Sequence, residues 1–351
     1  MVLVGKFMDI DFSEVTYLKN PCALTLKADY QQFLLSLSGP TIIDISGINN
    51  ESCRVITTLL HGNEPSGLIA IHRWLTEHSA LPVPETNIRI IICSVEAACK
   101  SPLLSHRYYP NGLDINRCFN TNETTGYFQR AQIIKQAILE VNPECVIDLH
   151  NTPGSGPAFA VCTIITPEVL SLTSLFCDTI ILSSLKIGGL MEQNFNCPIL
   201  TIECGSAHDE QSHETAYQGI NQLGNCSSIY HYNQKTDVDI ISKPFRFQLK
   251  PNVNLSYSEH DEGYEGVTLK SSIEQFNFGH ARKDQMIGWV DDRGLDNFQL
   301  LNDAYEDVLN EYFTLRDNQL VCATNIRIFM ATSNKEVATD DCLFYLVKSH
   351  Y

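Results

Sequence analysis

The feature that most constrains this fold is the alternation of short apolar runs with amphipathic stretches over about the first 234 residues. The apolar runs are rich in Ile and Val and have the length of buried strands. They are Thr41–Ile48, Cys53–Leu60, Ile88–Ser94, Cys145–Leu149, Phe159–Ile165 and Pro198–Glu203. The stretches between them have helical spacing: Pro65–Glu77, Tyr127–Val141, Pro167–Leu185 and His213–Tyr232. This alternation predicts an α/β fold with a mixed, largely parallel sheet and helices on both faces.

From about Lys235 the pattern changes to short strands separated by turn residues. The expected strands are Phe245–Leu249, Val253–Tyr257, Gly266–Lys270, Met286–Val290, Leu320–Phe329 and Cys342–Val347. One helix, Leu295–Tyr312, is expected among them. We therefore predict two domains, an α/β domain over residues 1–234 and a smaller β-rich C-terminal domain over residues 235–351.

Charge and composition argue against several classes of protein. The 351 residues carry a formal net charge of −17, and no cluster of four Lys or Arg residues provides the basic face that a nucleic-acid binder needs. No apolar run reaches the roughly 18 residues of a membrane span, and the first residues lack the pattern of a signal peptide. The 13 cysteines include no CxxC pair, which favours reduced, buried thiols. We expect a cytoplasmic protein with no nucleic-acid or membrane partner.

The sharpest chemical signal is the segment His61-Gly62-Asn63-Glu64-Pro65, which directly follows a predicted strand. A His at the strand end and a carboxylate at the start of the next helix can converge at the open end of the sheet. Imidazole and carboxylate are ligands of zinc, and a catalytic zinc takes three protein ligands and a water. The alternative is an acidic residue in the first turn of a helix beside an incidental His.

Two further strands end in residues of the right type. Asp148 and His150 close a buried strand, and their spacing places both on one face of it. His150 is then a candidate third metal ligand, and Asp148 can accept the second N–H of a ligating imidazole. Glu203 ends another buried strand and can act as acid and base on a zinc-activated water. An ordinary strand-end Glu and a satisfied core Asp are the structural alternatives.

A fourth segment, residues 106–119, carries Arg107, Asp114, Asn116 and Arg117 among turn residues and aromatic side chains. The two guanidinium groups supply local positive charge and a planar fork that matches a carboxylate. Taken alone, the segment also has the character of a surface loop.

Two competing sites are less favoured. His208 and His213 enclose an acidic run, but on a helix residues five apart lie about 140° apart and do not share a face. Cys118 and Cys204 flank the functional segments without an adjacent basic motif that would make a thiolate nucleophile.

Together the four segments resemble the succinylglutamate desuccinylase/aspartoacylase family, relatives of the zinc carboxypeptidases. The pieces that carry the resemblance are HGNE (residues 61–64), LDINR (113–117), DLH (148–150) and IECG (202–205). The resemblance implies that His61, Glu64 and His150 bind one zinc ion and that Glu203 is the catalytic acid and base. It also implies that Arg107 polarises the scissile carbonyl and that Asn116 and Arg117 hold a substrate carboxylate.

The sequence also differs from the family at one expected substrate-binding position. Residues 191–200, shortly before Glu203, lack the further substrate-binding arginine of aspartoacylase-like members. Tyr264 is the candidate for the family's later active-site tyrosine.

These observations predict a zinc-dependent amidohydrolase in residues 1–234 that cleaves an N-acyl amino acid or a similar small amide bearing a carboxylate. A metallocarboxypeptidase acting on peptides is the alternative enzyme, and a catalytically silent metal-binding protein is the alternative outside enzymes. The expected partner is a small-molecule substrate, and a homo-oligomer is an open alternative to a monomer.

Overall fold

A computed structural model describes residues 10–77, 80–184, 186–230, 237–302, 305–340 and 342–349. The chain divides into two compact units, one of residues 1–151 with 158–240 and one of residues 152–157 with 241–351. The short segment 152–157 therefore groups with the second unit, which the sequence did not predict. The predicted boundary between residues 234 and 235 lies outside the described residues.

The first unit contains a nine-stranded sheet with the order β1-β2-β4-β3-β5-β8-β6-β7-β9. β3 runs parallel to both β4 and β5, whereas β2 is antiparallel to β4 and β6 is antiparallel to β8. The predicted mixed α/β sheet is thus confirmed. Its strands are β1 (Thr16–Lys19), β2 (Thr41–Ile45), β3 (Asn49–Thr58), β4 (Thr86–Ile92), β5 (Cys145–Thr152), β6 (Phe159–Cys162), β7 (Thr179–Leu182), β8 (Ile199–Ser206) and β9 (Asp239–Ser242).

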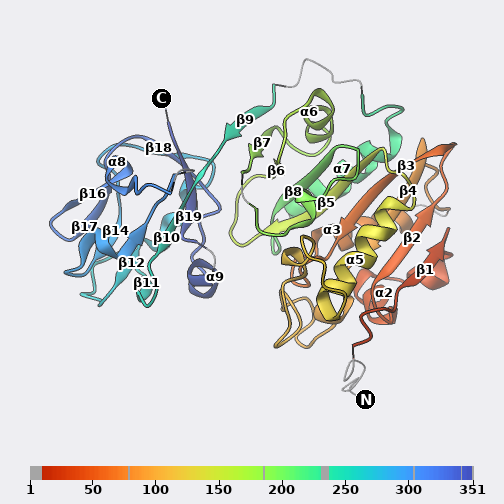
Figure 1. The fold of residues 1–351 in the computed structure, drawn as a ribbon, viewed down its shortest axis with the longest axis horizontal. Helices are drawn as coiled ribbons and strands as arrows, with labels where there is room; N and C mark the ends of the chain where they lie inside the picture. The colour runs from red at the N-terminus through yellow and green to blue at the C-terminus, as the bar shows by residue number, and fades with distance from the viewer. Residues whose placement is uncertain are drawn as a thin grey trace. The chain divides into compact units, whose positions relative to one another are not determined.

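Helices cover both faces of this sheet. Consecutive strand residues point to opposite sides, so each face packs against its own set of helices. Val55 and Val146 pack with Ile134 of α5 on one face of the sheet. Figure 1 shows α5 in yellow. Ile56 and Ile147 pack on the other face in the core that includes α3 and α7. The helices of this unit are α1 (Ala23–Leu26), α2 (Tyr30–Ser36), α3 (Ser66–Thr76), α4 (Val95–Ala98), α5 (Gly126–Leu139), α6 (Pro167–Thr173) and α7 (Glu210–Asn225), with 3-10 turns η1 (Ile115–Arg117) and η2 (Leu190–Glu192).

One predicted helix of this unit is too long. The stretch Pro167–Leu185 was expected to be helical throughout, but α6 ends at Thr173 and the chain then forms strand β7. The run Thr179-Ile180-Ile181 is β-branched, which favours a strand, and it pairs in parallel with β6. Sheet pairing therefore overrides the helical spacing of the apolar residues.

The second unit is β-rich, as predicted, and contains two five-stranded sheets. One has the order β13-β18-β19-β10-β15 and the other β11-β12-β14-β17-β16. The strands are β10 (Phe245–Leu249), β11 (Leu255–Tyr257), β12 (Val267–Leu269), β13 (His280–Ala281), β14 (Met286–Val290), β15 (Phe298–Gln299), β16 (Phe313–Arg316), β17 (Gln319–Cys322), β18 (Ile326–Phe329) and β19 (Phe344–Lys348). The helical elements are η3 (Ser271–Phe276), η4 (Gly294–Asn297), α8 (Leu309–Tyr312) and α9 (Lys335–Asp340).

The predicted helix Leu295–Tyr312 is wrong. A 3-10 turn, the short strand β15 and the single-turn helix α8 occupy parts of that stretch. Phe298 is fully buried, pairs with Leu249 of β10 and stacks on Phe247 with ring centroids 4.8 Å apart. Packing in the aromatic core of this unit therefore decides the local conformation.

Two further observations bear on the sequence predictions. No helix among the described residues is long and apolar enough to cross a membrane. Eight of the thirteen cysteines are buried, among them Cys145, Cys162 and Cys342, whereas four are half-buried, including Cys197, and Cys22 is exposed. The prediction of buried thiols therefore holds for most of the cysteines but not for Cys197.

Candidate metal centre

The site forms where neighbouring parallel strands β3 and β5 end. Their register pairs Thr57 with Asp148 and Thr58 with Leu149, so the residues that follow both strands emerge at the same edge of the sheet. His61 and Glu64 lie in the turn between β3 and α3, and His150 lies near the end of β5. Strand pairing thus brings together residues that are almost ninety positions apart in the sequence.

Two glycines allow the turn after β3 to pack this closely. A Cβ atom on Gly62 would lie 2.6 Å from the backbone nitrogen of Ala98, and one on Gly67 would lie 2.2 Å from Thr58 Oγ1. The backbone N–H of Gly62 also donates to the carbonyl of Arg107 at 2.9 Å. The turn is therefore fixed against α4, the end of β3 and the segment that carries Arg107.

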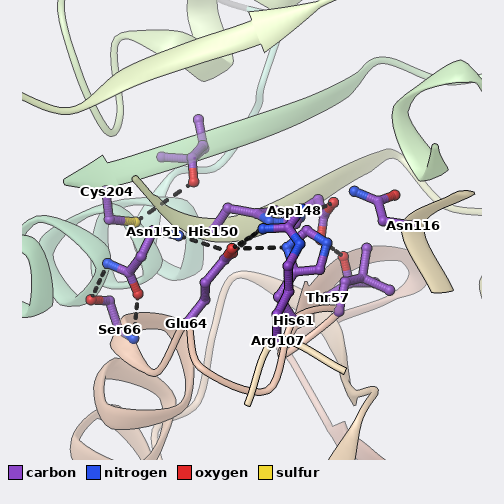
Figure 2. A network of polar contacts seen from close by, with 12 residues as sticks. Thr57, His61, Glu64, Ser66, Arg107, Asn116, Asp148, His150, Asn151 and Cys204 are labelled. Atoms are coloured by element: carbon purple, nitrogen blue, oxygen red, sulfur yellow. Dashed lines mark hydrogen bonds and ion pairs between the residues drawn. The ribbon is translucent and has the colours of Figure 1, made fainter. Parts of the chain in front are cut away.

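The three predicted metal ligands converge on one point. Glu64 Oε1 lies 2.8 Å from His61 Nδ1, and Glu64 Oε2 lies 2.7 Å from His150 Nδ1. One ligand atom from each residue lies within 4.8 Å of the other two, and all three residues are buried. Figure 2 shows the Glu64 carboxylate pointing toward both imidazoles.

The second nitrogen of each imidazole also meets a carboxylate. Asp148 Oδ2 accepts from His150 Nε2 at 2.8 Å, and its other oxygen accepts the hydroxyl of Thr57 at 2.6 Å. Asp114 Oδ1 lies 3.0 Å from His61 Nε2 and plays the same part for that ring. Such partners fix the tautomer that leaves Nδ1 facing a metal. The sequence predicts this relation for Asp148 but not for Asp114, whose only signal is its place in the LDINR segment.

The pKa values of this cluster reflect the facing charges. Burial alone would raise the pKa of the Glu64 carboxyl, but His61 and His150 more than offset it and hold that pKa well below the usual range. Burial would lower the pKa of His150, yet Asp148 and Glu64 raise it well above the usual value. The pKa of Asp114, which burial alone would raise, is also lowered, by His61 and then by Arg107 and Arg117.

The donor set of this cluster fits a zinc ion. Two imidazole nitrogens and one carboxylate are the three protein ligands found at catalytic zinc sites such as that of thermolysin. The carboxylates behind both rings complete the hydrogen bonding that ligating histidines require. Among the described residues, no other three His, Cys, Asp or Glu side chains bring one ligand atom each within 4.8 Å of one another.

Glu203 lies on β8, the strand next to β5, and is close enough to His150 and Glu64 for their charges to affect it. Its Oε2 atom is buried and has no hydrogen-bond partner. Burial, with a contribution from the charge of Glu64, raises its pKa to about 7, although the charge of His150 acts in the opposite direction. A carboxyl group with that pKa can both accept and donate a proton near neutral pH.

Arg107, Asn116 and Arg117 border the cluster on a more exposed segment. Arg107 lies 3.3 Å from Glu64 Oε1 and also donates to Asp114 Oδ2. Arg117 donates to the Asn116 carbonyl at 2.9 Å and lies 3.9 Å from Asp114 Oδ2. The Arg107 and Arg117 side chains are 43% and 40% exposed, so both remain accessible to solvent.

A buried polar network that the sequence did not reveal supports the turn after β3. Asn151 Nδ2 donates to the Ser66 hydroxyl and to the carbonyl of Gly205, and the backbone N–H of Asn151 donates to Glu64 Oε2. Ser66 Oγ lies 2.8 Å from His213 Nδ1. His213, part of the competing metal cluster considered from the sequence, thus bonds to the start of α3.

Tyr264, the candidate for the family's later active-site tyrosine, lies in the second unit and is 37% exposed.

The fold and this cluster together define the class of protein, an α/β protein with a zinc-carboxypeptidase-like sheet and a buried His-Glu-His group that could hold a metal. Residues 54–173 match the model of the succinylglutamate desuccinylase/aspartoacylase catalytic domain. The resemblance to that family is therefore confirmed over these residues.

Solved structures agree in fold. The succinylglutamate desuccinylase/aspartoacylase from Rhodobacter sphaeroides is similar at 16% sequence identity and a TM-score of 0.58, over 88% of each chain. The succinylglutamate desuccinylase from Vibrio parahaemolyticus shares 14% identity with a TM-score of 0.56, over 92% of this chain and 95% of that one. Murine aminoacylase 3 shares 15% identity with a TM-score of 0.51, over 84% of this chain and 94% of that one. No curated protein matches the chain.

Proposed function

We propose that this protein is a zinc-dependent hydrolase that cleaves the amide bond of an N-acyl amino acid or a similar small amide bearing a carboxylate. The observation that carries the proposal is the convergence of His61, Glu64 and His150 beside Glu203. One oxygen of the Glu203 carboxyl group is buried without a partner, and the pKa of that group is raised to about 7. A site that only bound metal would have no need of a fourth carboxyl group held in that state.

His61, Glu64 and His150 would hold the metal through two Nδ1 atoms and one carboxylate. A zinc ion bound there supplies Lewis-acid chemistry, which brings the pKa of a bound water from 15.7 toward about 7. Glu203 takes the proton of the attacking water and returns it to the departing nitrogen. This double role requires a pKa close to the working pH, which burial provides for Glu203.

The exposed segment supplies the remaining roles. Arg107 donates to the carbonyl oxygen as negative charge develops on it, because its guanidinium already lies beside Glu64 at the edge of the cluster. Asn116 and Arg117 hold the substrate carboxylate and so set which bond lies over the cluster. The overall negative charge of the chain makes such a local cationic group necessary for an anionic substrate.

The test combines metal analysis with a substrate panel. Purified protein is assayed for zinc and then for release of free amine from N-acetyl and N-succinyl amino acids, from matched amino acid amides, and from short peptides with free carboxyl ends. Hydrolysis of N-acyl amino acids that a chelator abolishes and zinc restores is the expected result. Cleavage of the peptides alone would favour a carboxypeptidase, and zinc-loaded protein inert on the whole panel would overturn the proposal.

The variant His150→Ala controls for contaminating hydrolases. It removes one of the three donors, so we expect it to lose both zinc and turnover. Activity that persists in this variant would not come from the cluster.

A further inference from the structure

A second loop packs directly against the segment that carries Asn116 and Arg117. The backbone N–H of Leu190 donates to Asn116 Oδ1 at 2.8 Å, and the N–H of Phe119 donates to the carbonyl of Gly188 at 3.0 Å. A Cβ atom on Gly188 would lie only 2.6 Å from the carbonyl oxygen of Arg117. Residues 186–193 and 113–120 therefore lie in backbone contact, and neither can shift without the other.

Glu192 holds the loop of residues 186–193 closed and ties it to residues 113–120. Its Oε1 accepts the backbone N–H groups of Ile187 and Gly189 at 2.8 and 2.9 Å. Its Oε2 accepts the side-chain amide of Asn120 at 2.6 Å. Both carboxylate oxygens thus have defined partners, one within the loop and one across it.

The chain of bonds continues to the helix behind the loops. Asn120 Oδ1 accepts the side-chain amide of Gln193, and Gln193 Oε1 accepts Lys135 Nζ of α5 at 2.7 Å. Every donor in this series faces an acceptor, so the order Glu192, Asn120, Gln193, Lys135 has only one consistent arrangement of amide groups. We call Glu192, Asn120 and Gln193 the clamp.

We propose that the clamp is a positioning device that holds Asn116 and Arg117 in the orientation that binds a substrate carboxylate. This inference rests on the proposed function. Because Asn116 Oδ1 is occupied by the N–H of Leu190, Asn116 is left with its Nδ2 donor for a ligand. With the Arg117 guanidinium beside it, this part of the loop then offers mainly N–H donors to a ligand, which suits a carboxylate.

The variant Glu192→Gln tests the clamp at one atom. Glutamine keeps an oxygen for the N–H groups of Ile187 and Gly189, but it places an amide donor opposite the amide donor of Asn120. The double variant Asn120→Asp/Glu192→Gln reverses that pair. The new glutamine donates to the new aspartate, whose other oxygen still accepts from Gln193, and the net charge equals that of the unmodified chain.

Hydrogen exchange measures the clamp without any substrate. In Glu192→Gln we expect exchange of backbone amides in residues 113–120 and 186–193 to accelerate about tenfold, and the double variant should restore slow exchange. Glu123→Gln, which removes an exposed acid just after residues 113–120, should leave exchange unchanged. Unaltered exchange in Glu192→Gln would overturn the proposal whatever the enzyme hydrolyses.

Kinetics with a hydrolysed N-acyl amino acid then measure the role of the clamp. We expect Glu192→Gln to raise KM about tenfold with kcat within about twofold, and the double variant to recover most of the loss. A fall in kcat at unchanged KM would overturn the positioning role. Failure of the unmodified protein to hydrolyse the panel, with exchange behaving as expected, would refute the proposed function and leave the clamp standing as a link between the loops.

Discussion

The candidate site has two parts that differ in burial and in the way they are held. The floor consists of His61, Glu64, Asp148, His150 and Glu203, and the side chains of the first four are 0–8% exposed. The rim consists of Arg107, Asn116 and Arg117, and its two guanidinium groups are 43% and 40% exposed. Strand ends and buried carboxylate–imidazole bonds fix the floor, whereas backbone contacts between loops fix the rim.

This difference suggests a division of labour. Electrostatic interactions are strong where water is excluded, so the floor suits metal binding and bond cleavage. The rim exchanges contact with water for contact with a ligand, so it suits recognition. Changes in the floor should therefore alter kcat or metal affinity, and changes in the rim should alter KM.

The largest expected effect comes from Glu203, whose free oxygen faces no protein partner. Glu203→Gln keeps the shape of the side chain but cannot take a proton from water. We expect kcat to fall about 10³-fold with the zinc content unchanged, measured by steady-state kinetics and metal analysis on one preparation. Turnover near that of the unmodified protein would remove Glu203 from the chemistry and break the proposed division.

The floor was largely predictable from the sequence, whereas the way the rim is held was not. His61, His150 and Glu203 each follow a run of apolar residues, and parallel strands deliver such residues to one edge of the sheet. Asp114 and Glu192 lie in loops whose conformations depend on contacts between distant segments, and local patterns carry no information on those contacts. The helix expected over Leu295–Tyr312 failed for the same reason, because burial of Phe298 against Phe247 outweighed helical spacing.

A second effect of Glu203→Gln concerns stability and depends on pH. The folded pKa of Glu203 is raised to about 7 from an ordinary value of 4.5, so the folded state releases this proton at higher pH than the unfolded chain. Below pH 4.5 the group costs nothing, and between about 4.5 and 7 the stability of the metal-free protein falls as pH rises. Above pH 7 the ionised Glu203 lowers the free energy of unfolding by the full amount, about 3 kcal/mol.

Urea unfolding of the metal-free proteins measures this cost. The stability advantage of Glu203→Gln over the unmodified chain should grow from pH 4.5 to pH 8 by about 3 kcal/mol. Glu210→Gln, at the exposed start of α7, should show no such growth. An advantage independent of pH would mean that Glu203 is ionised without penalty, and the floor would then be better solvated than its burial implies.

Asp148 and Asp114 test where the floor ends. Asp148 is fully buried and bonds to His150 of the floor and to Thr57 of the neighbouring strand β3. Asp114 bonds to His61 of the floor and to Arg107 of the rim. We expect Asp148→Asn and Asp114→Asn each to weaken zinc binding about 10- to 100-fold, measured by competition with a chelator.

At saturating zinc the two variants should differ. Asp148→Asn should then recover most of its kcat/KM, whereas Asp114→Asn should stay impaired because its amide no longer accepts from Arg107. Equal recovery of both variants would show that Asp114 belongs to the floor alone.

The smallest expected effect lies at Arg117, the exposed end of the rim. Arg117→Ala would remove the proposed charge-assisted contact to the substrate carboxylate, and the 40% exposure of the Arg117 side chain limits the strength of such a contact. We expect KM to rise about tenfold with little change in kcat. The KM of Arg117→Lys should lie between those of the unmodified protein and Arg117→Ala, because lysine keeps the charge but loses the planar fork. The matched substrate with a carboxamide in place of the carboxylate is the control, since Arg117→Ala should not weaken its binding further. If both substrates lose affinity equally, Arg117 acts on the loop and not on the carboxylate, and recognition by the rim would then rest on Asn116.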